Sequence, residues 1–229
     1  MESDSFTSGI QTVALQFVPF MLAVVAHEFA HGWAAARFGD STAKDAGRLT
    51  LNPLPHIDPI GTLLFPLINM FTGIPLLFGW ARPVPIDPRR FRKLRVGLFW
   101  VAFAGPLMNF ALALLSSFAF VSVVVWMPED FYLHEPLKGM ALISVSLNFA
   151  LGIFNLLPLP PLDGSRMIES FLPLRFARKY ESFARYSTLI LLGLFFTGAI
   201  RVIHGPIEFL TRFTLGGTLM FFNLLTSGT

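Results

Sequence analysis

Long apolar runs separated by short polar connections make up most of the chain. Four of them approach or exceed the roughly 20 residues that the hydrocarbon core of a bilayer requires of a helix. These runs cover residues 10–38, 96–127, 139–157 and 186–202. The pattern therefore predicts an all-α polytopic membrane protein with about four clear transmembrane helices.

A fifth apolar run, residues 59–80, is interrupted by several prolines and glycines. A plain spanning helix tolerates few such residues, because each weakens the backbone hydrogen bonding on which a helix in lipid depends. We predict a broken or re-entrant element here, with a full span as the alternative. The polar connection before it contains GRLTLN, residues 47–52, in which Leu49 and Leu51 alternate with polar neighbours and predict a small β-like segment.

Composition supports a membrane protein and excludes some kinds of site. Of the 229 residues, 54% are hydrophobic and 14% are charged, whereas a soluble domain carries roughly 25% charged residues. No polar connection is long enough to fold alone, so we expect one domain. The chain has no cysteine, which excludes disulfides and cysteine-ligated metals.

The basic residues predict a topology rather than a nucleic-acid partner. Residues 81–95 hold six basic residues and one acidic residue, residues 166–185 hold five basic residues, and the loop 128–138 is acidic. Lysine and arginine favour the cytoplasmic side of a membrane, so we place the first two connections inside and the third outside. A re-entrant 59–80 puts the N-terminus outside and brings more basic residues to the cytoplasmic side than a full span does. We expect no nucleic acid to bind.

Three ionisable side chains interrupt the first apolar run in the pattern HExxH: His27, Glu28 and His31. On a helix, positions i and i+4 share a face, so the two imidazoles converge on one point as in a zinc site. Glu28 can reach a water bound to that metal and act as general base. Placing these groups in apolar sequence is costly unless a metal or another partner holds them. The setting therefore favours a metal site over two buried core histidines.

A catalytic zinc usually has three protein ligands and one open position, so a third ligand must come from elsewhere in the chain. The candidates are Asp163, His56, Asp58, Glu169 and His204. With a re-entrant 59–80, the helix over 139–157 ends on the side of the membrane that His31 approaches, and prolines break this helix just before Asp163. We therefore prefer Asp163. His56 and Asp58 either support the ligands from behind or form a turn before the apolar run, and we favour the turn.

Three segments, AHEFAH, AGPLMN and NLLPLPPLDG, occur in this order and resemble the signature segments of the site-2 protease family of intramembrane zinc metalloproteases. The resemblance implies that His27, His31 and Asp163 bind Zn²⁺ and that Glu28 is the general base. It also implies that Asn155 helps to hold the substrate or the oxyanion.

The resemblance covers a catalytic core at about 11–166. We predict a single membrane-embedded metalloprotease domain over 1–229, with a C-terminal span and an interfacial tail at about 186–229. The chain has no room for the PDZ or CBS domains that many members of the family carry, so it resembles a minimal form.

The predicted function is that of an intramembrane zinc endopeptidase in the plasma membrane, with its active site towards the cytoplasmic side. Its expected partners are the lipid bilayer and single-span or other transmembrane protein substrates; the sequence favours no particular oligomeric state. The alternative is a non-enzymatic membrane zinc-binding protein, such as a transporter or a scaffold. Glu28 argues against a scaffold, and the few polar residues within 96–127 argue against a transport path.

Overall fold

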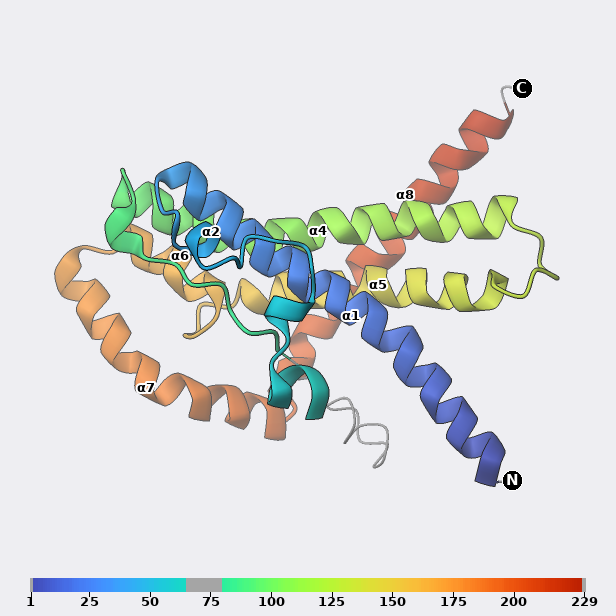
Figure 1. The fold of residues 1–229 in the computed structure, drawn as a ribbon, viewed down its shortest axis with the longest axis horizontal. Coiled ribbons are helices and arrows are strands. Elements are labelled where there is room, and N and C mark those ends of the chain that lie inside the picture. Colours follow the sequence, from blue (N-terminus) through green and yellow to red (C-terminus); the bar gives the residue numbers. More distant parts are fainter. Residues whose placement is uncertain (1, 65–79, 228–229) are drawn as a thin grey trace.

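The computed structural model describes residues 2–64 and 80–227, and every regular element in this part of the chain is a helix (Figure 1). The long helices are α1 (Glu2–Phe38), α4 (Leu94–Trp126), α5 (His134–Asn155), α7 (Leu174–Phe196) and α8 (His204–Ser227). The shorter elements are α2 (Thr42–Asp45), α6 (Asp163–Phe171), a π-helical segment (Pro59–Leu64) and 3-10 helices at Leu54–His56, Pro88–Arg90 and Ala199–Ile203. The predicted all-α class is confirmed for the described residues.

Helix α4 lies at the centre and contacts α1, α5, α6 and α8. It forms an antiparallel pair with α5, and α1 crosses this pair (Figure 1). Small residues take part in the buried contacts: Ala34 and Ala35 of α1 pack near Val101, and Ala113 of α4 packs near Val145. Small side chains let helix backbones approach closely, as helices in membranes commonly do.

Among the described residues, two helices are long and apolar enough to cross a membrane, α4 and α5. They correspond to the predicted spans 96–127 and 139–157. The other two predicted spans, which overlap α1 and α7, stay predictions. Helix α7 also begins at Leu174, inside the connection that the sequence predicts to be a basic loop.

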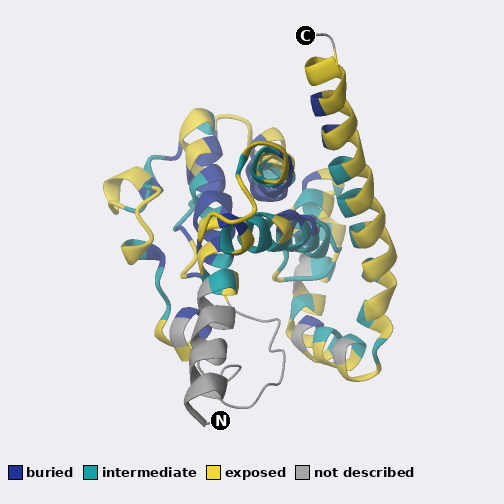
Figure 2. Cartoon of the chain, turned by 90° about the vertical axis from the view of Figure 1, so that its right-hand side faces the viewer, coloured by how far each residue is buried: buried dark blue, intermediate teal, exposed yellow. Residues whose placement is uncertain are grey.

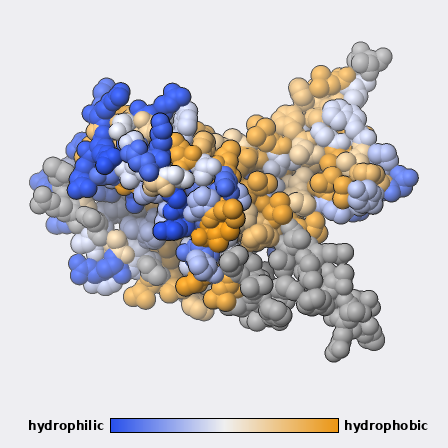
Figure 3. Space-filling view, viewed as in Figure 1, coloured by the Kyte–Doolittle hydropathy of each residue, from blue (hydrophilic) through white to orange (hydrophobic). Residues whose placement is uncertain are grey.

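The surface separates into an apolar middle and two polar ends. Hydrophilic residues gather at the end that contains α2 and the start of α4, and a smaller group lies at the opposite end around the loop between α4 and α5 (Figure 3). Helix α8 runs along the outside and is exposed over most of its length (Figure 2). Its exposed side chains include Phe209, Phe213 and Met220. A wide apolar surface between polar ends is the surface expected of a protein in a bilayer.

The predicted β-like segment at 47–52 is not confirmed, and the structure has irregular backbone there, with a turn at its start and a bend at residues 50–51. The backbone hydrogen bonds of this segment are made locally: the Arg48 N–H donates to the Ala43 carbonyl, and the Thr50 hydroxyl accepts the Asn52 N–H. Side chains that bond to nearby backbone in this way compete with strand pairing, and the short alternation of Leu49 and Leu51 does not outweigh them.

The flanks of the predicted broken element lie side by side. Residues 65–79, which form most of it, lie outside the described residues. On either side of them, the Arg82 N–H donates to the His56 carbonyl at 2.8 Å, and the Thr62 hydroxyl donates to the Trp80 carbonyl at 2.8 Å. The chain therefore rejoins the described part close to where it leaves it.

Candidate metal centre

Helix α1 presents His27 and His31 together on its buried face, as the i, i+4 spacing predicts. Their exposed fractions are 8% and 7%, and their Nε2 atoms are 2.9 Å apart. The two rings stand nearly perpendicular, with centroids 4.6 Å apart. Both imidazole edges thus point at one buried location.

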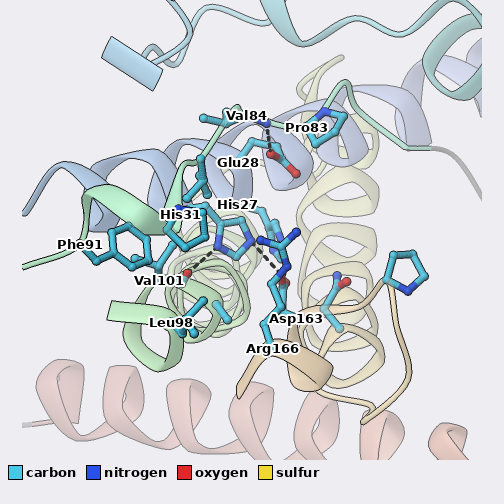
Figure 4. A pocket seen from close by; sticks show the side chains of 15 residues that line it. His27, Glu28, His31, Pro83, Val84, Phe91, Leu98, Val101, Asp163 and Arg166 are labelled. Carbon is cyan, nitrogen blue, oxygen red and sulfur yellow. Dashed lines mark hydrogen bonds and ion pairs between the residues drawn. The ribbon is translucent and has the colours of Figure 1, made fainter. Parts of the chain in front are cut away.

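Asp163, the first residue of α6, completes this group from a distant part of the sequence (Figure 4). Its Oδ2 lies 3.1 Å from His27 Nε2, and its Oδ1 lies 3.3 Å from His31 Nε2. The next residue must be small, because a Cβ on Gly164 would lie 2.6 Å from the Leu157 carbonyl oxygen. Of the five candidates for a third ligand, the structure brings Asp163 to the histidines.

Helix α4 supplies the hydrogen-bond acceptors behind the two histidines. His31 Nδ1 donates to the Val101 carbonyl at 2.6 Å, and His27 Nδ1 donates to the Asn109 side-chain oxygen at 2.6 Å. A ring that donates from Nδ1 keeps the lone pair of Nε2 when it is neutral. These acceptors orient both rings with Nε2 towards Asp163.

The three side chains fit a metal ion. Their ligand atoms all lie within 4.8 Å of one another. With both Nδ1 atoms donating, two Nε2 lone pairs face each other at 2.9 Å beside a carboxylate, an arrangement that is repulsive without a cation between them. Two imidazoles and one carboxylate are a known ligand set for catalytic Zn²⁺.

Glu28 and Asn155 line the same cavity, which has a volume of about 190 Å³. Glu28 is half-buried, and its Oε2 accepts the Val84 N–H at 2.7 Å (Figure 4). Val84 belongs to the irregular segment that leads into α4. Asn155 is the last residue of α5, and its Nδ2 donates to the Leu151 carbonyl at 3.1 Å. The metal ligands, the Glu28 carboxylate and the Asn155 amide therefore line one cavity.

The other candidates for the third ligand lie outside the metal group, which is the cluster of His27, His31 and Asp163. His56 is buried, with its Nε2 3.0 Å from the Thr50 carbonyl oxygen. Asp58 accepts the backbone N–H groups of Ile60 and Gly61 at 3.0 and 2.7 Å. This is the behaviour of a turn residue at the start of a helical segment, in agreement with the interpretation we favoured. Glu169 lies on α6 and His204 begins α8.

The segment AGPLMN has a structural role that sequence reasoning did not assign. Gly105 brings the α4 backbone against the metal group, because a Cβ at this position would lie 2.6 Å from His27 Nε2. One helical turn later, Asn109 reaches the other ring nitrogen of His27. An asparagine within a strongly apolar helix is the one signal that could have marked this contact.

Replacement of Gly105 by alanine is expected to weaken zinc binding by at least about 10-fold, since effects of this size follow when groups behind metal ligands are disturbed. The added methyl group would collide with both imidazoles and push α4 away from α1. Zinc affinity of the purified variant, measured by competition with a chelating dye, tests this expectation.

Gly139→Ala is the matched control, because a Cβ at Gly139 of α5 meets nothing within 4 Å. A glycine-to-alanine change inside a helix otherwise stabilises by about 1 kcal/mol. Equal zinc affinities in the two variants would contradict the close approach of α4 to the site.

Comparisons with known proteins identify the family. The model of peptidase family M50 matches residues 133–198, a range that includes Asp163. The "Putative zinc metalloprotease YwhC" of Bacillus subtilis is 40% identical over 181 residues, which are 79% of this chain and 79% of the relative. Proteins named "Putative zinc metalloprotease Rip2" are 29% identical in Mycolicibacterium smegmatis and 30% identical in Mycobacterium tuberculosis. These matches cover 84% and 77% of this chain and 71% and 64% of the relatives. No solved structure matches the chain.

The relatives extend the match well beyond the region of the family model. An identity of 40% over 79% of both chains agrees with the resemblance carried by the three sequence motifs. The chain therefore belongs to peptidase family M50, the site-2 protease family.

Proposed function

We propose that this protein hydrolyses peptide bonds within or near transmembrane segments of membrane-protein substrates. Its membership of peptidase family M50 makes it a zinc metalloprotease of the site-2 protease type. The main support for cleavage within or near transmembrane segments is the position of the metal group. His27, His31 and Asp163 lie within 4.8 Å of one another, packed against α4, a helix long and apolar enough to span a bilayer.

In this proposal, His27, His31 and Asp163 hold the zinc ion. When bound, zinc supplies Lewis-acid polarisation of the peptide carbonyl and makes water a competent nucleophile near neutral pH. The Val84 N–H fixes one oxygen of Glu28, which leaves the other to accept the proton of the attacking water. Glu28 then returns this proton to the leaving amine.

Asn155 is the proposed donor to the oxyanion. It lines the cavity beside Asp163, and its amide has two N–H groups. One of them is engaged with the Leu151 carbonyl, so the other is free to donate to a substrate oxygen. A preorganised donor of this kind stabilises negative charge as it develops in the transition state.

A transmembrane substrate must unwind locally before cleavage, because the peptide bonds of a helix are closed by hydrogen bonds to one another. We therefore expect preferred substrates to have small or helix-breaking residues near the cleaved bond, where opening the helix is least costly. The lipid bilayer is the expected setting for this encounter.

Cleavage of a panel of single-span substrates by the detergent-purified protein tests the proposal. We expect zinc-dependent products whose termini, identified by mass spectrometry, map within or near the transmembrane segment. Chelator treatment should stop the reaction, and added zinc should restore it. A protein that binds zinc but cleaves none of the panel would support the alternative of a non-enzymatic zinc-binding membrane protein.

We further propose that the active site faces the cytoplasm of a plasma-membrane protein and that the N-terminus lies outside. The Arg92 N–H donates to the Phe38 carbonyl at 2.9 Å, which places the end of α1 beside the start of α4. The starts of α1 and α5 then lie towards the other end of the molecule (Figure 1). The hydrogen bond between Arg82 and His56 supports a 59–80 segment that returns to the side it left.

Single cysteines on this cysteine-free chain test the topology. Ser5→Cys and Glu129→Cys should react with an impermeant reagent in intact cells, whereas Ser182→Cys should react only after permeabilisation. If Ser5→Cys also needed permeabilisation while Glu129→Cys did not, the N-terminus would lie inside and 59–80 would span the membrane fully.

A further inference from the structure

We propose that two buried asparagines, Asn109 on α4 and Asn148 on α5, form a relay that fixes the tautomer of His27 and keeps its Nε2 available to zinc. The proposal rests on the proposed zinc site. It assigns a positioning role to two residues that do not contact the metal ligand atoms themselves.

The relay is continuous and closed to solvent. His27 Nδ1 lies 2.6 Å from Asn109 Oδ1, Asn109 Nδ2 lies 2.9 Å from Asn148 Oδ1, and Asn148 Nδ2 lies 2.9 Å from the Ser144 carbonyl oxygen. The exposed fractions of Asn109 and Asn148 are 0% and 1%. Buried polar groups among apolar helices are costly unless each has a partner, so the whole chain of hydrogen bonds is expected to form together.

The direction of the relay follows from its far end. The Ser144 carbonyl can only accept, so the Asn148 atom that faces it must be the amide nitrogen. The Asn148 oxygen then faces Asn109 and requires a donor there, which turns the Asn109 oxygen towards His27. The Ala23 carbonyl, 3.4 Å from Asn109 Nδ2, favours the same orientation. His27 Nδ1 must therefore carry the hydrogen, and Nε2 keeps its lone pair.

The two histidines are thus oriented by different means. His31 donates directly to a backbone carbonyl of α4, whereas His27 depends on side chains from α4 and α5. Reversing either amide would set two donors or two acceptors against each other in a buried place, which costs the desolvation of both groups. The packing of α5 on α4 is therefore coupled to the metal-binding form of His27.

Zinc affinity of five variants in detergent, two of which are controls, tests the relay. Asn109→Leu removes the acceptor for His27, and we expect zinc to bind 10–100-fold more weakly, the usual loss for residues that orient metal ligands. Asn109→Asp keeps an oxygen for His27 but sets a second acceptor against Asn148 Oδ1, so we expect a zinc affinity between those of Asn109→Leu and the wild type. Asn148→Ala removes the anchor of the relay and should weaken zinc binding about 10-fold, with less change in volume.

Ser117→Ala is the control for loss of a buried polar contact on α4. Ser117 is fully buried and bonds to Thr218 of α8, so its loss disturbs helix packing without touching the relay. We expect this variant to bind zinc as the wild type does. Circular dichroism shows whether each variant folds. If Asn109→Leu does not fold, the zinc affinity of Asn148→Ala tests the relay instead.

Wild-type zinc affinity in both Asn109→Leu and Asn148→Ala would overturn the relay, as would an equal loss in Ser117→Ala. His27→Ala separates this failure from failure of the zinc site. If His27→Ala also bound zinc normally, the proposed ligands would be wrong. If only His27→Ala lost zinc, the proposed zinc ligands would be supported and the proposed relay would be wrong.

Discussion

Glu28→Gln is expected to lose peptide cleavage by roughly 10²–10⁴-fold, or about 3 to 5 kcal/mol of barrier, which is the usual contribution of general-base catalysis. Glutamine preserves the shape of the side chain, and its amide oxygen can still accept the Val84 N–H that holds Glu28 at 2.7 Å. Its other end is an amide nitrogen, which cannot take a proton from water. The variant should fold and keep about one zinc per chain, because Glu28 is not among the proposed ligands.

Zinc content and cleavage rate measured on one preparation separate the possible roles of Glu28. Glu208→Gln, on the exposed α8 pair with Arg212, makes the same chemical change away from the cavity and should leave both quantities unchanged. Undiminished cleavage in Glu28→Gln would remove Glu28 as the base. Loss of zinc in step with activity would make it a structural residue instead.

The parts of the site that depend on local sequence could be predicted. The i, i+4 spacing alone places His27 and His31 on one helical face, and the structure has them there with Nε2 atoms 2.9 Å apart. The apolar runs likewise predicted α4 and α5, with three of the four ends within two residues of those observed; α5 begins five residues earlier than predicted, at His134. Lipid requires helices to satisfy their own backbone hydrogen bonds, so hydropathy reports these elements directly.

Contacts between distant segments were predictable only in part. Asp163 could be preferred as the third ligand because the basic loops predicted the topology of the chain in the membrane. That topology placed the end of the helix before Asp163 on the side of the membrane that His31 approaches. The contacts of Asn109 with His27 and Asn148 join residues 82 and 39 positions apart in the sequence. They depend on the register of α1, α4 and α5 against one another, which no local pattern encodes.

Two misreadings came from taking polarity as a sign of secondary structure. The basic residues after Arg166 suggested a loop, yet α7 begins at Leu174, because arginine and lysine are good helix formers. Alternating leucines at 47–52 suggested a strand, although a strand also needs a partner. Local hydrogen bonds to Thr50 and Asn52 are made there instead.

Asp163→Ala is expected to weaken zinc binding by more than the roughly 10–100-fold attributed to residues that only orient metal ligands, and to reduce cleavage to background. The carboxylate is the one anionic member of the group, at 3.1 and 3.3 Å from the two Nε2 atoms. Its removal leaves two neutral imidazoles, one ligand short of the three that a catalytic zinc usually has. Zinc affinity and cleavage should therefore fall together, in contrast to Glu28→Gln.

Glu169→Ala provides the comparison for Asp163→Ala, because it removes a carboxylate from the same helix, α6, and was itself a sequence candidate for the third ligand. We expect it to keep zinc. If Glu169→Ala lost zinc while Asp163→Ala kept wild-type zinc content and activity, the third ligand would have to be reassigned. Loss of zinc in Asp163→Ala alone would show that the metal binds at the start of α6. Zinc binding would then depend on the turn against the Leu157 carbonyl that Gly164 permits. The broken end of α5 would then be a requirement of the metal site, since a helix continued past Asn155 could not return Asp163 to α1.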